Sequence, residues 1–281
     1  MLTNTFCHIP GIGPKSERIL WDRGILSWED ALEAVPGQSL GRNRHHLKNS
    51  VLESIDRLEE HDTHYFSRQL PSHQQWRLFD EFRSSVVYLD IETSGMAPPD
   101  DFITTISTYD GTSISYYVKD YNLDQFKYDI EKYDVVVTYN GKCFDVPVLE
   151  SHFGIRMDQA QIDLRFVLKS LGFTGGLKGC EKKLGIDRQE LDGVDGYLAV
   201  LLWQDFAATN NPRALETLLA YNILDAVNLE MLMVKAYNMK LKETPFLETH
   251  RLDLPSPVEN LFEADSAIVK KLLDYKEMRF S

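Results

Sequence analysis

Two carboxylates stand one residue apart at the end of an apolar run in the middle of the chain. The run spans Val86 to Thr93, and its acidic residues are Asp90 and Glu92. Successive side chains of a strand point to opposite faces, so Asp90 and Glu92 share one face. Two like charges this close repel each other unless a cation lies between them, and hard divalent cations prefer carboxylate oxygens. The pair therefore predicts a metal site at the end of a buried strand.

Two further segments carry an acid in a position that suits the same cation. Asn140 breaks a buried-looking strand, and Asp145 follows near the start of a helix, where negative charge is favoured. That segment alone fits a metal ligand and a helix N-cap equally well. Tyr221 and Asp225 lie four residues apart in a long apolar segment, so on a helix they share a face. A carboxylate inside so apolar a helix is costly unless it is paired.

The order of these segments resembles the DEDD superfamily of DnaQ-like 3′–5′ exonucleases, whose motifs are DxE, NxxxFD and either YxxxD or HxxxD. The matching stretches here are Asp90-Ile91-Glu92, Asn140 to Asp145, and Tyr221 to Asp225, within roughly residues 85 to 240. Because the third motif has a tyrosine rather than a histidine, the chain resembles the DEDDy branch of this superfamily. Gly175-Gly176-Leu177-Lys178, together with an N-terminal hairpin, is similar to the YprB-like group of ribonuclease H-like proteins.

This resemblance implies an α/β, ribonuclease H-like fold, a mixed sheet flanked by helices. It implies a metal-dependent 3′–5′ exonuclease acting on DNA or RNA, above all on single-stranded 3′ ends. By the same resemblance, two divalent cations, Mg²⁺ or Mn²⁺, would be bound by four carboxylates: Asp90, Glu92, Asp145 and Asp225. Tyr221 would orient the attacking water, because a phenol with an ordinary pKa of about 10 is a better hydrogen-bonding group than a general base.

Three residues near these motifs are candidates for contacts to the nucleic acid. We expect Thr93, Asn140 and Lys178 to lie along the bound strand. Asn140 suits a loop-holding or nucleotide-contacting role better than metal binding. For Lys178 the alternative is a solvated helix face, but an acidic metal centre nearby favours a phosphate contact.

A short turn near the N-terminus is a second candidate site. Gly11 and Gly13 allow a tight turn with exposed backbone amides, Pro14 opens a helix, and Lys15 adds positive charge. The turn resembles the hairpin of a helix-hairpin-helix motif, in which backbone amides hold a phosphate. The alternative is a helical packing module, and acidic neighbours such as Glu17 weaken a phosphate site.

The pattern of helices and strands divides the chain into four parts. We expect a small all-α, helix-hairpin-helix-like domain over 1–60, a connector over 61–84, the nuclease domain over 85–240, and a C-terminal extension with a helix over 241–281. The strands at 86–91, 102–109 and 113–118 predict an antiparallel meander, with a two-residue turn at Asp110-Gly111. Further patterns predict a strand at 135–139 and helices at 123–133, 163–171, 214–240 and 266–275, with Asp163 as a helix cap.

Composition limits the setting in which this chemistry takes place. The chain has 30 basic and 43 acidic residues, a formal charge of −13, so a nucleic acid must be held by local basic groups or metals. Three cysteines without a CxxC pair indicate neither a zinc site nor a disulfide scaffold. With no basic start and no apolar run near the roughly 20 residues that span a bilayer, we expect a cytoplasmic protein without a membrane partner.

Two other interpretations use the same residues. A catalytically weak module with this fold would recognise nucleic-acid ends or a repair partner, although four unused carboxylates would destabilise it without metal. Alternatively, the carboxylates are helix caps and ion-pair partners. We disfavour this second alternative because no Lys or Arg adjoins Asp90 and Glu92 in the sequence.

Overall fold

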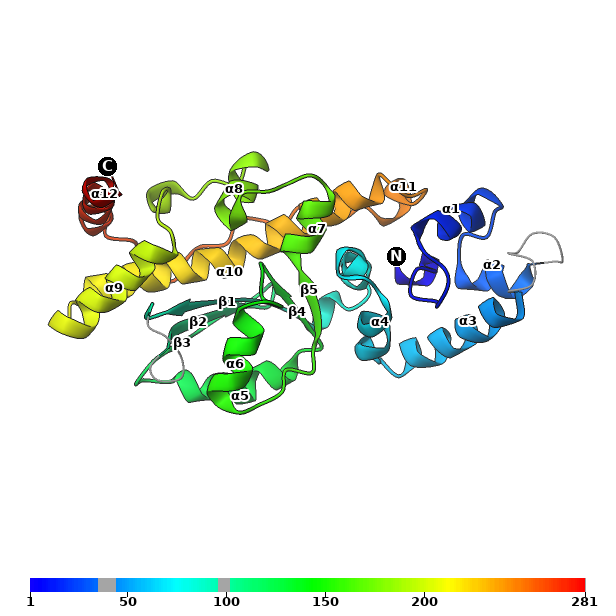
Figure 1. Ribbon diagram of the computed structural model, residues 1–281, viewed down its shortest axis with the longest axis horizontal. Coiled ribbons are helices and arrows are strands. Elements are labelled where there is room, and N and C mark those ends of the chain that lie inside the picture. The colour runs from blue at the N-terminus through cyan, green and yellow to red at the C-terminus, as the bar shows by residue number, and fades with distance from the viewer. Residues whose placement is uncertain (35–43, 96–101, 281) are drawn as a thin grey trace.

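A five-stranded mixed sheet lies at the centre of the computed structural model, which describes residues 1–34, 44–95 and 102–280 (Figure 1). The strand order is β3-β2-β1-β4-β5. The bounds are β1 (Val86–Thr93), β2 (Ile103–Tyr109), β3 (Ile114–Val118), β4 (Val135–Thr138) and β5 (Ala160–Asp163). The first three strands form the predicted antiparallel meander, and β4 and β5 run parallel to β1. The predicted mixed sheet is confirmed, and β5 is an addition to the predicted strands.

The alternation of β1 sends its side chains into two separate cores. Val87, Leu89 and Ile91 pack under α5 (Phe126–Asp129) and α6 (Asp145–Phe153). On the other face, the core that contains Val86 and Tyr88 is closed by α10 (Pro212–Leu241) and α7 (Leu164–Ser170). Figure 1 shows α10 along one face of the sheet and α6 on the opposite face. Asp90 and Glu92, in step with Tyr88, therefore face α10.

Helix α10 runs the length of the sheet and carries two of the predicted site residues. Pro212 occupies its first turn, and the Asn211 side chain caps it by accepting from the Arg213 backbone amide. It is the one helix of the described ranges long and apolar enough to cross a bilayer, yet 83% of its most apolar 18-residue window is buried inside the protein. That burial is typical of a core helix.

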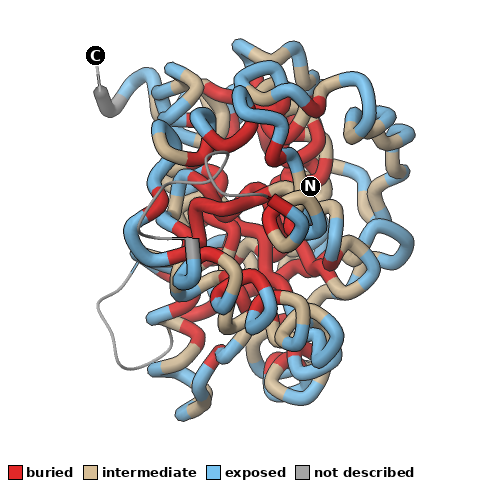
Figure 2. The backbone as a smooth tube through the Cα atoms, turned by 90° about the vertical axis from the view of Figure 1, so that its right-hand side faces the viewer, coloured by how far each residue is buried: buried red, intermediate tan, exposed pale blue. Residues whose placement is uncertain are grey.

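The N-terminal region is helical and packs against the end of α10. Its elements are η1 (Leu2–Asn4), α1 (Pro14–Asp22), α2 (Trp28–Glu33), α3 (Arg44–Glu59), α4 (Thr63–Gln69), η3 (Ser72–Leu78) and η4 (Arg83–Ser85). One core cluster joins side chains of this region, such as Leu2 and Trp21, to Tyr237 of α10. In Figure 2 the buried residues form a continuous mass through the molecule. The four-part division stays a prediction, and residues 35–43 of the first part lie outside the described residues.

The remaining elements connect and cover the sheet. They are η5 (Leu123–Gln125), η6 (Ile130–Lys132), α8 (Gly176–Lys183), η7 (Gln189–Leu191), α9 (Gly196–Thr209), α11 (Leu247–His250) and α12 (Ser266–Phe280). The helical stretch predicted at 123–133 is present as η5, α5 and η6 in succession. The two-residue hairpin turn is wrong, because the loop spans Asp110 to Ser113. The Asp110 carboxylate accepts from the backbone amides of Thr112 and Ser113 and so stabilises the longer turn.

Candidate metal centre

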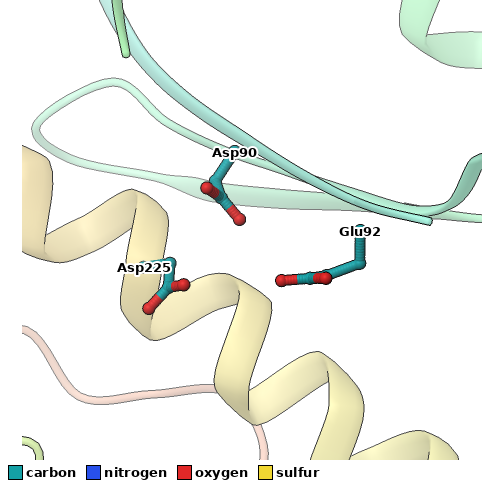
Figure 3. Close-up of side chains that lie close together, drawn as sticks. All are labelled: Asp90, Glu92 and Asp225. Atoms are coloured by element: carbon teal, nitrogen blue, oxygen red, sulfur yellow. The ribbon is translucent and has the colours of Figure 1, made fainter. Parts of the chain in front are cut away.

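Three carboxylates from the strand and the long helix meet in one cluster, which we call the acidic triad: Asp90, Glu92 and Asp225. Figure 3 shows Asp90 and Glu92 reaching from the strand towards Asp225 on the helix. One ligand oxygen from each lies within 4.8 Å of the others. Glu92 is 9% exposed and Asp225 is 3% exposed. Strand alternation and the packing of α10 on that face produce this meeting, as the sequence predicts.

The triad is electrostatically strained. Burial raises the pKa of Asp90 and of Glu92 well above the ordinary values, and the charge of Asp225 raises both further. The Glu92 side chain has no hydrogen-bond or ion-pair partner among residues 1–34, 44–95 and 102–280. A buried carboxylate without a partner is costly to ionise, so these side chains favour either a proton or a cation.

Two basic side chains compensate part of this charge, both at Asp225. Lys178 Nζ pairs with Asp225 Oδ1, and Arg188 Nη2 lies 2.7 Å from the same oxygen. Arg188 Nη1 also donates to both oxygens of Glu181 at 3.0 Å, and Asn228 donates to Glu181 at 2.8 Å. The triad and Glu181 thus set four carboxylates against two cations. When all six groups are ionised, two negative charges stay uncompensated.

Neither Arg188 nor Glu181 was among the site residues predicted from the sequence. Arg188 follows α8 in a loop with no periodic pattern, so nothing local indicates that it folds back onto Asp225. Asp90 and Glu92 have no basic neighbour in the sequence. The fold nevertheless brings Lys178 close enough for its charge to lower the pKa of both.

A buried amide fixes the orientation of Asp90. Asn222 Nδ2 donates to Asp90 Oδ2 at 2.7 Å, and Asn222 Oδ1 accepts from Ser107 Oγ at 2.7 Å. The chain Ser107–Asn222–Asp90 leaves the other Asp90 oxygen for the centre of the triad. Asn222 was also missed, although a fully buried polar residue in an apolar helix is a signal that could have identified it.

Tyr221 lies beside the triad, one helical turn from Asp225. It is 2% exposed, and its ring centroid lies 4.6 Å from Lys178 Nζ and 5.4 Å from Arg188 Cζ. Burial, followed by the charges of Asp225 and Glu92, raises the pKa of its hydroxyl. Tyr221 is therefore a neutral phenol, which can position a group by hydrogen bonding.

Asp145 approaches the triad from the opposite side of the sheet. It is the first residue of α6, and the N-cap is Phe144, so the N-cap interpretation of Asp145 is wrong. Burial raises the pKa of Asp145 to about 7. Its charge acts on Asp90 and Glu92, but its oxygens are not part of the 4.8 Å cluster, because α6 packs on the face away from α10.

The two remaining predicted contacts of this domain lie at the carboxyl ends of β1 and β4. Thr93 ends β1 at an irregularity of the pairing next to Glu92. Asn140 adopts a left-handed φ of 70°, and its backbone amide donates to Asp163 Oδ1 at 2.8 Å. Asp163 also caps α7 by accepting from the Arg165 amide, which confirms the predicted cap. The side chain of Asn140 accepts from Arg165 Nη1, so Asn140 holds the loop.

The N-terminal turn is not brought together with the triad. Gly11, Gly13 and Lys15 are exposed on the loop and first turn of α1, at the α11 end of the molecule in Figure 1. A cavity of about 540 Å³ opens beside this turn. The expectation that Glu17 weakens a phosphate site there is wrong, because Glu17 is turned inward and paired with Arg77 at 2.7 Å.

The donor set of the triad fits a hard divalent cation. All three groups offer carboxylate oxygens, their ligand atoms are close together, and the cluster carries more negative charge than its basic neighbours compensate. The unpartnered carboxylate of Glu92 is the clearest sign, because a cation would satisfy it without any rearrangement of the fold.

Comparison with known proteins gives a family match and a partly similar solved structure. A family model described as RNase_H superfamily matches residues 87–237, more than half of the chain. Among solved structures, the family B DNA polymerase of the hyperthermophilic archaeon Pyrobaculum calidifontis is similar at 18% identity, with a TM-score of 0.44. That match covers 60% of this chain and 27% of the polymerase, so this chain corresponds to about a quarter of the polymerase's length. No curated protein matches the chain.

Proposed function

This chain belongs to the ribonuclease H superfamily, and from that premise we propose that it is a metal-dependent 3′–5′ exonuclease of DNA or RNA. The observation that carries the proposal is the acidic triad, three carboxylates within 4.8 Å on the α10 face of the sheet. A buried cluster with excess negative charge is unfavourable by itself and becomes favourable when it binds a cation.

The acidic triad supplies the residues that would hold the metal, and the resemblance to the DEDD exonucleases adds Asp145. Asp90, Glu92 and Asp225 would bind it directly, and Asp145 would complete a site for two cations, Mg²⁺ or Mn²⁺. Bound there, divalent cations activate water and neutralise the charge that develops on a phosphodiester during hydrolysis. The chain's own part is to orient these carboxylates, which Asn222 does for Asp90 by donating to its Oδ2 atom.

Lys178 and Tyr221 have roles that differ from metal binding. The Lys178 side chain is 29% exposed, whereas Arg188 is 4% exposed, so Lys178 is the cation that can leave Asp225. Once a metal compensates Asp225, Lys178 is free to pair with a phosphate of the substrate. Tyr221 keeps its proton and would donate it in a hydrogen bond to the attacking water.

The direct test is digestion of DNA and RNA oligonucleotides labelled at one end, with Mg²⁺ or Mn²⁺. A 5′-labelled strand should shorten stepwise, and Asp90→Ala should lower the rate by at least about 10³-fold. Asp110→Ala removes a carboxylate from the β2–β3 turn and should leave the rate unchanged. Equal rates in the wild type and Asp90→Ala would refute the proposal.

Metal binding can be tested without turnover. Mn²⁺ at about 100 times its dissociation constant should stabilise the wild type by about 2.7 kcal/mol, because it binds the folded state alone. Asp90→Ala should lose most of that stabilisation. Labelled ends that are bound but never shortened would instead support the end-binding module.

A further inference from the structure

A cavity separate from the acidic triad opens at the carboxyl ends of β4 and β5. Its volume is about 580 Å³. We call it the edge pocket, and its lining includes Tyr139, Asn140, Arg165, Lys169, Phe173 and the loop 174–176. Only Asn140 of these residues belongs to the motifs that identify the acidic site.

Strand register places this pocket next to the triad. β1 and β4 are parallel, and Tyr88 pairs with Val137. Two residues farther along the chain come Asp90, in β1, and Tyr139, which directly follows β4 and packs against the same core as Tyr88 and Val137. Neighbouring strands lie about 4.8 Å apart, so the pocket begins roughly one strand spacing from Asp90 and continues to α7 and the loop 173–176. A strand of nucleic acid with its end at the triad would reach the pocket within one or two nucleotides.

The pocket carries positive charge that no carboxylate of the described residues pairs with. Arg165 and Lys169 are four residues apart on α7, so they project from one face, and both are exposed. Neither forms an ion pair with a carboxylate in the part of the chain that the structure describes. Arg165 is held towards the pocket by Asn140 Oδ1. In a protein with a formal charge of −13, two uncompensated cations at one opening favour an anionic ligand.

Aromatic rings complete the pocket. Tyr139 and Phe173 are half-buried in its lining. The hydroxyl of Tyr139 lies 3.7 Å from Cys180 Sγ, and burial raises its pKa, so the ring is fixed and uncharged. Cations beside aromatic rings are typical of sites for single-stranded nucleic acids, where phosphates meet the cations and bases stack on the rings.

We infer that the edge pocket binds the single-stranded substrate one or two nucleotides from the end held at the triad. Arg165 and Lys169 contact its phosphates, and a base stacks on Tyr139 or Phe173. This inference rests on the proposed function, because it takes the triad as the place where the end of the strand lies.

The test measures binding in the absence of turnover. The probe is a fluorescein-labelled single-stranded oligonucleotide of about 12 nucleotides, titrated with protein in EDTA at several salt concentrations. Arg165→Gln/Lys169→Gln should raise the Kd about tenfold and reduce the slope of log Kd against log salt by about 1.4, because each lost phosphate contact removes about 0.7. Thermal unfolding should change little, since both side chains are exposed and the variant loses one exposed hydrogen bond, from Arg165 to Asn140.

The matched control removes two positive charges near the amino ends of β4 and β5, whereas the pocket lies at their carboxyl ends. Lys132 and Arg156 are exposed and precede β4 and β5, respectively. Lys132→Gln/Arg156→Gln should change the Kd less than twofold. Equal effects of the two double variants would overturn the inference, and so would wild-type protein that binds a duplex more tightly than the single strand.

The outcomes separate this inference from the proposed function. If Asp90→Ala abolishes digestion but the pocket variant binds like the control, the pocket inference fails alone. If no digestion occurs but the pocket variant loses binding and salt dependence, the pocket stands and the exonuclease proposal fails.

Discussion

Two buried acidic groups of this protein differ in how they are satisfied. Glu17, in the N-terminal region, is 1% exposed and accepts hydrogen bonds from the backbone amides of Phe6 and Cys7, at 2.7 and 3.1 Å. Arg77 adds two bonds to it, at 3.0 and 2.7 Å. At the acidic triad, Glu92 is buried without any such partner among the described residues. Both side chains are buried, but the Glu17 carboxylate has hydrogen-bond and ion-pair partners and the Glu92 carboxylate has none in the described part of the chain.

The difference separates a structural charge from a site. A buried ion pair with all its hydrogen bonds made holds the fold in one arrangement and has nothing left to offer a ligand. A buried carboxylate cluster with surplus charge is unstable by itself, so it favours binding a proton or a cation. Burial alone therefore does not identify a site, whereas the balance of partners does.

The largest effect on stability is expected at the Glu17–Arg77 pair. Glu17→Gln keeps the shape of the side chain but leaves the Arg77 guanidinium buried beside a neutral group. We expect a loss of about 3–5 kcal/mol in the free energy of unfolding, measured by urea denaturation. Glu60→Gln removes a partner of Arg57 in an exposed pair and should cost about 1 kcal/mol or less. A loss as small for Glu17→Gln would mean that the pair is not structural.

Arg188 lies between the two cases, and a smaller effect is expected there. Its bonds to Glu181 resemble those of the Glu17 pair, while its contact with Asp225 belongs to the triad. Arg188→Met should cost about 2 kcal/mol without metal, because Glu181 keeps Asn228 and Asp225 keeps Lys178. Mn²⁺ should restore part of that loss, since it compensates Asp225 but not Glu181.

Urea denaturation with and without Mn²⁺ checks this prediction. Lys178→Met is the matched control, because it also removes a cation from Asp225 but leaves Glu181 paired. Mn²⁺ should bring Lys178→Met close to the wild type and Arg188→Met only part of the way. If Mn²⁺ restored the stability of both variants equally, the ion pair between Arg188 and Glu181 would contribute nothing to stability.

The local patterns of the sequence predict the parts of the site that depend on one element. Strand alternation places Asp90 and Glu92 on one face, and helical spacing places Tyr221 and Asp225 on another, so the triad follows once α10 covers the sheet. Asp163 as a cap depends only on the residues after it, and it is confirmed.

The partners of these residues depend on contacts that no local pattern contains. Arg77 is 60 residues from Glu17, and Asn222 donates to an aspartate 132 residues away. The expectation that Glu17 opposes a phosphate site failed for this reason, since its charge is compensated by a residue of another segment. The side from which Asp145 approaches also follows from the packing of α6, which helical periodicity does not specify.

The smallest expected effect is the change of stability with pH. This change has opposite signs for the N-terminal region and for the candidate metal centre. His8, in the N-terminal region, is 1% exposed, bonds Ser54 Oγ at 2.8 Å and lies 5.5 Å from the rings of Trp28 and Phe66. Burial, followed by the charge of Arg77, lowers the pKa of His8 to about 3. The unfolded value is about 6.5, so between these values the unfolded chain binds more protons. The contribution of His8 to stability is full above pH 6.5 and is lost as the pH falls towards 3.

Three buried carboxylates at the candidate metal centre have the opposite slope. The raised pKa values of Asp90, Glu92 and Asp145 mean that the folded protein holds protons that the unfolded chain has released, so their contribution to stability falls as the pH rises from about 4.

Urea denaturation of metal-free protein at pH 5, 6 and 7 separates the two regions. The stability difference between wild type and His8→Gln should shift by about 1–2 kcal/mol in favour of the wild type from pH 5 to 7. Glu92→Gln should shift in the other direction, gaining on the wild type as the pH rises. Parallel curves for all three proteins would show that neither buried group sets the pH dependence of folding.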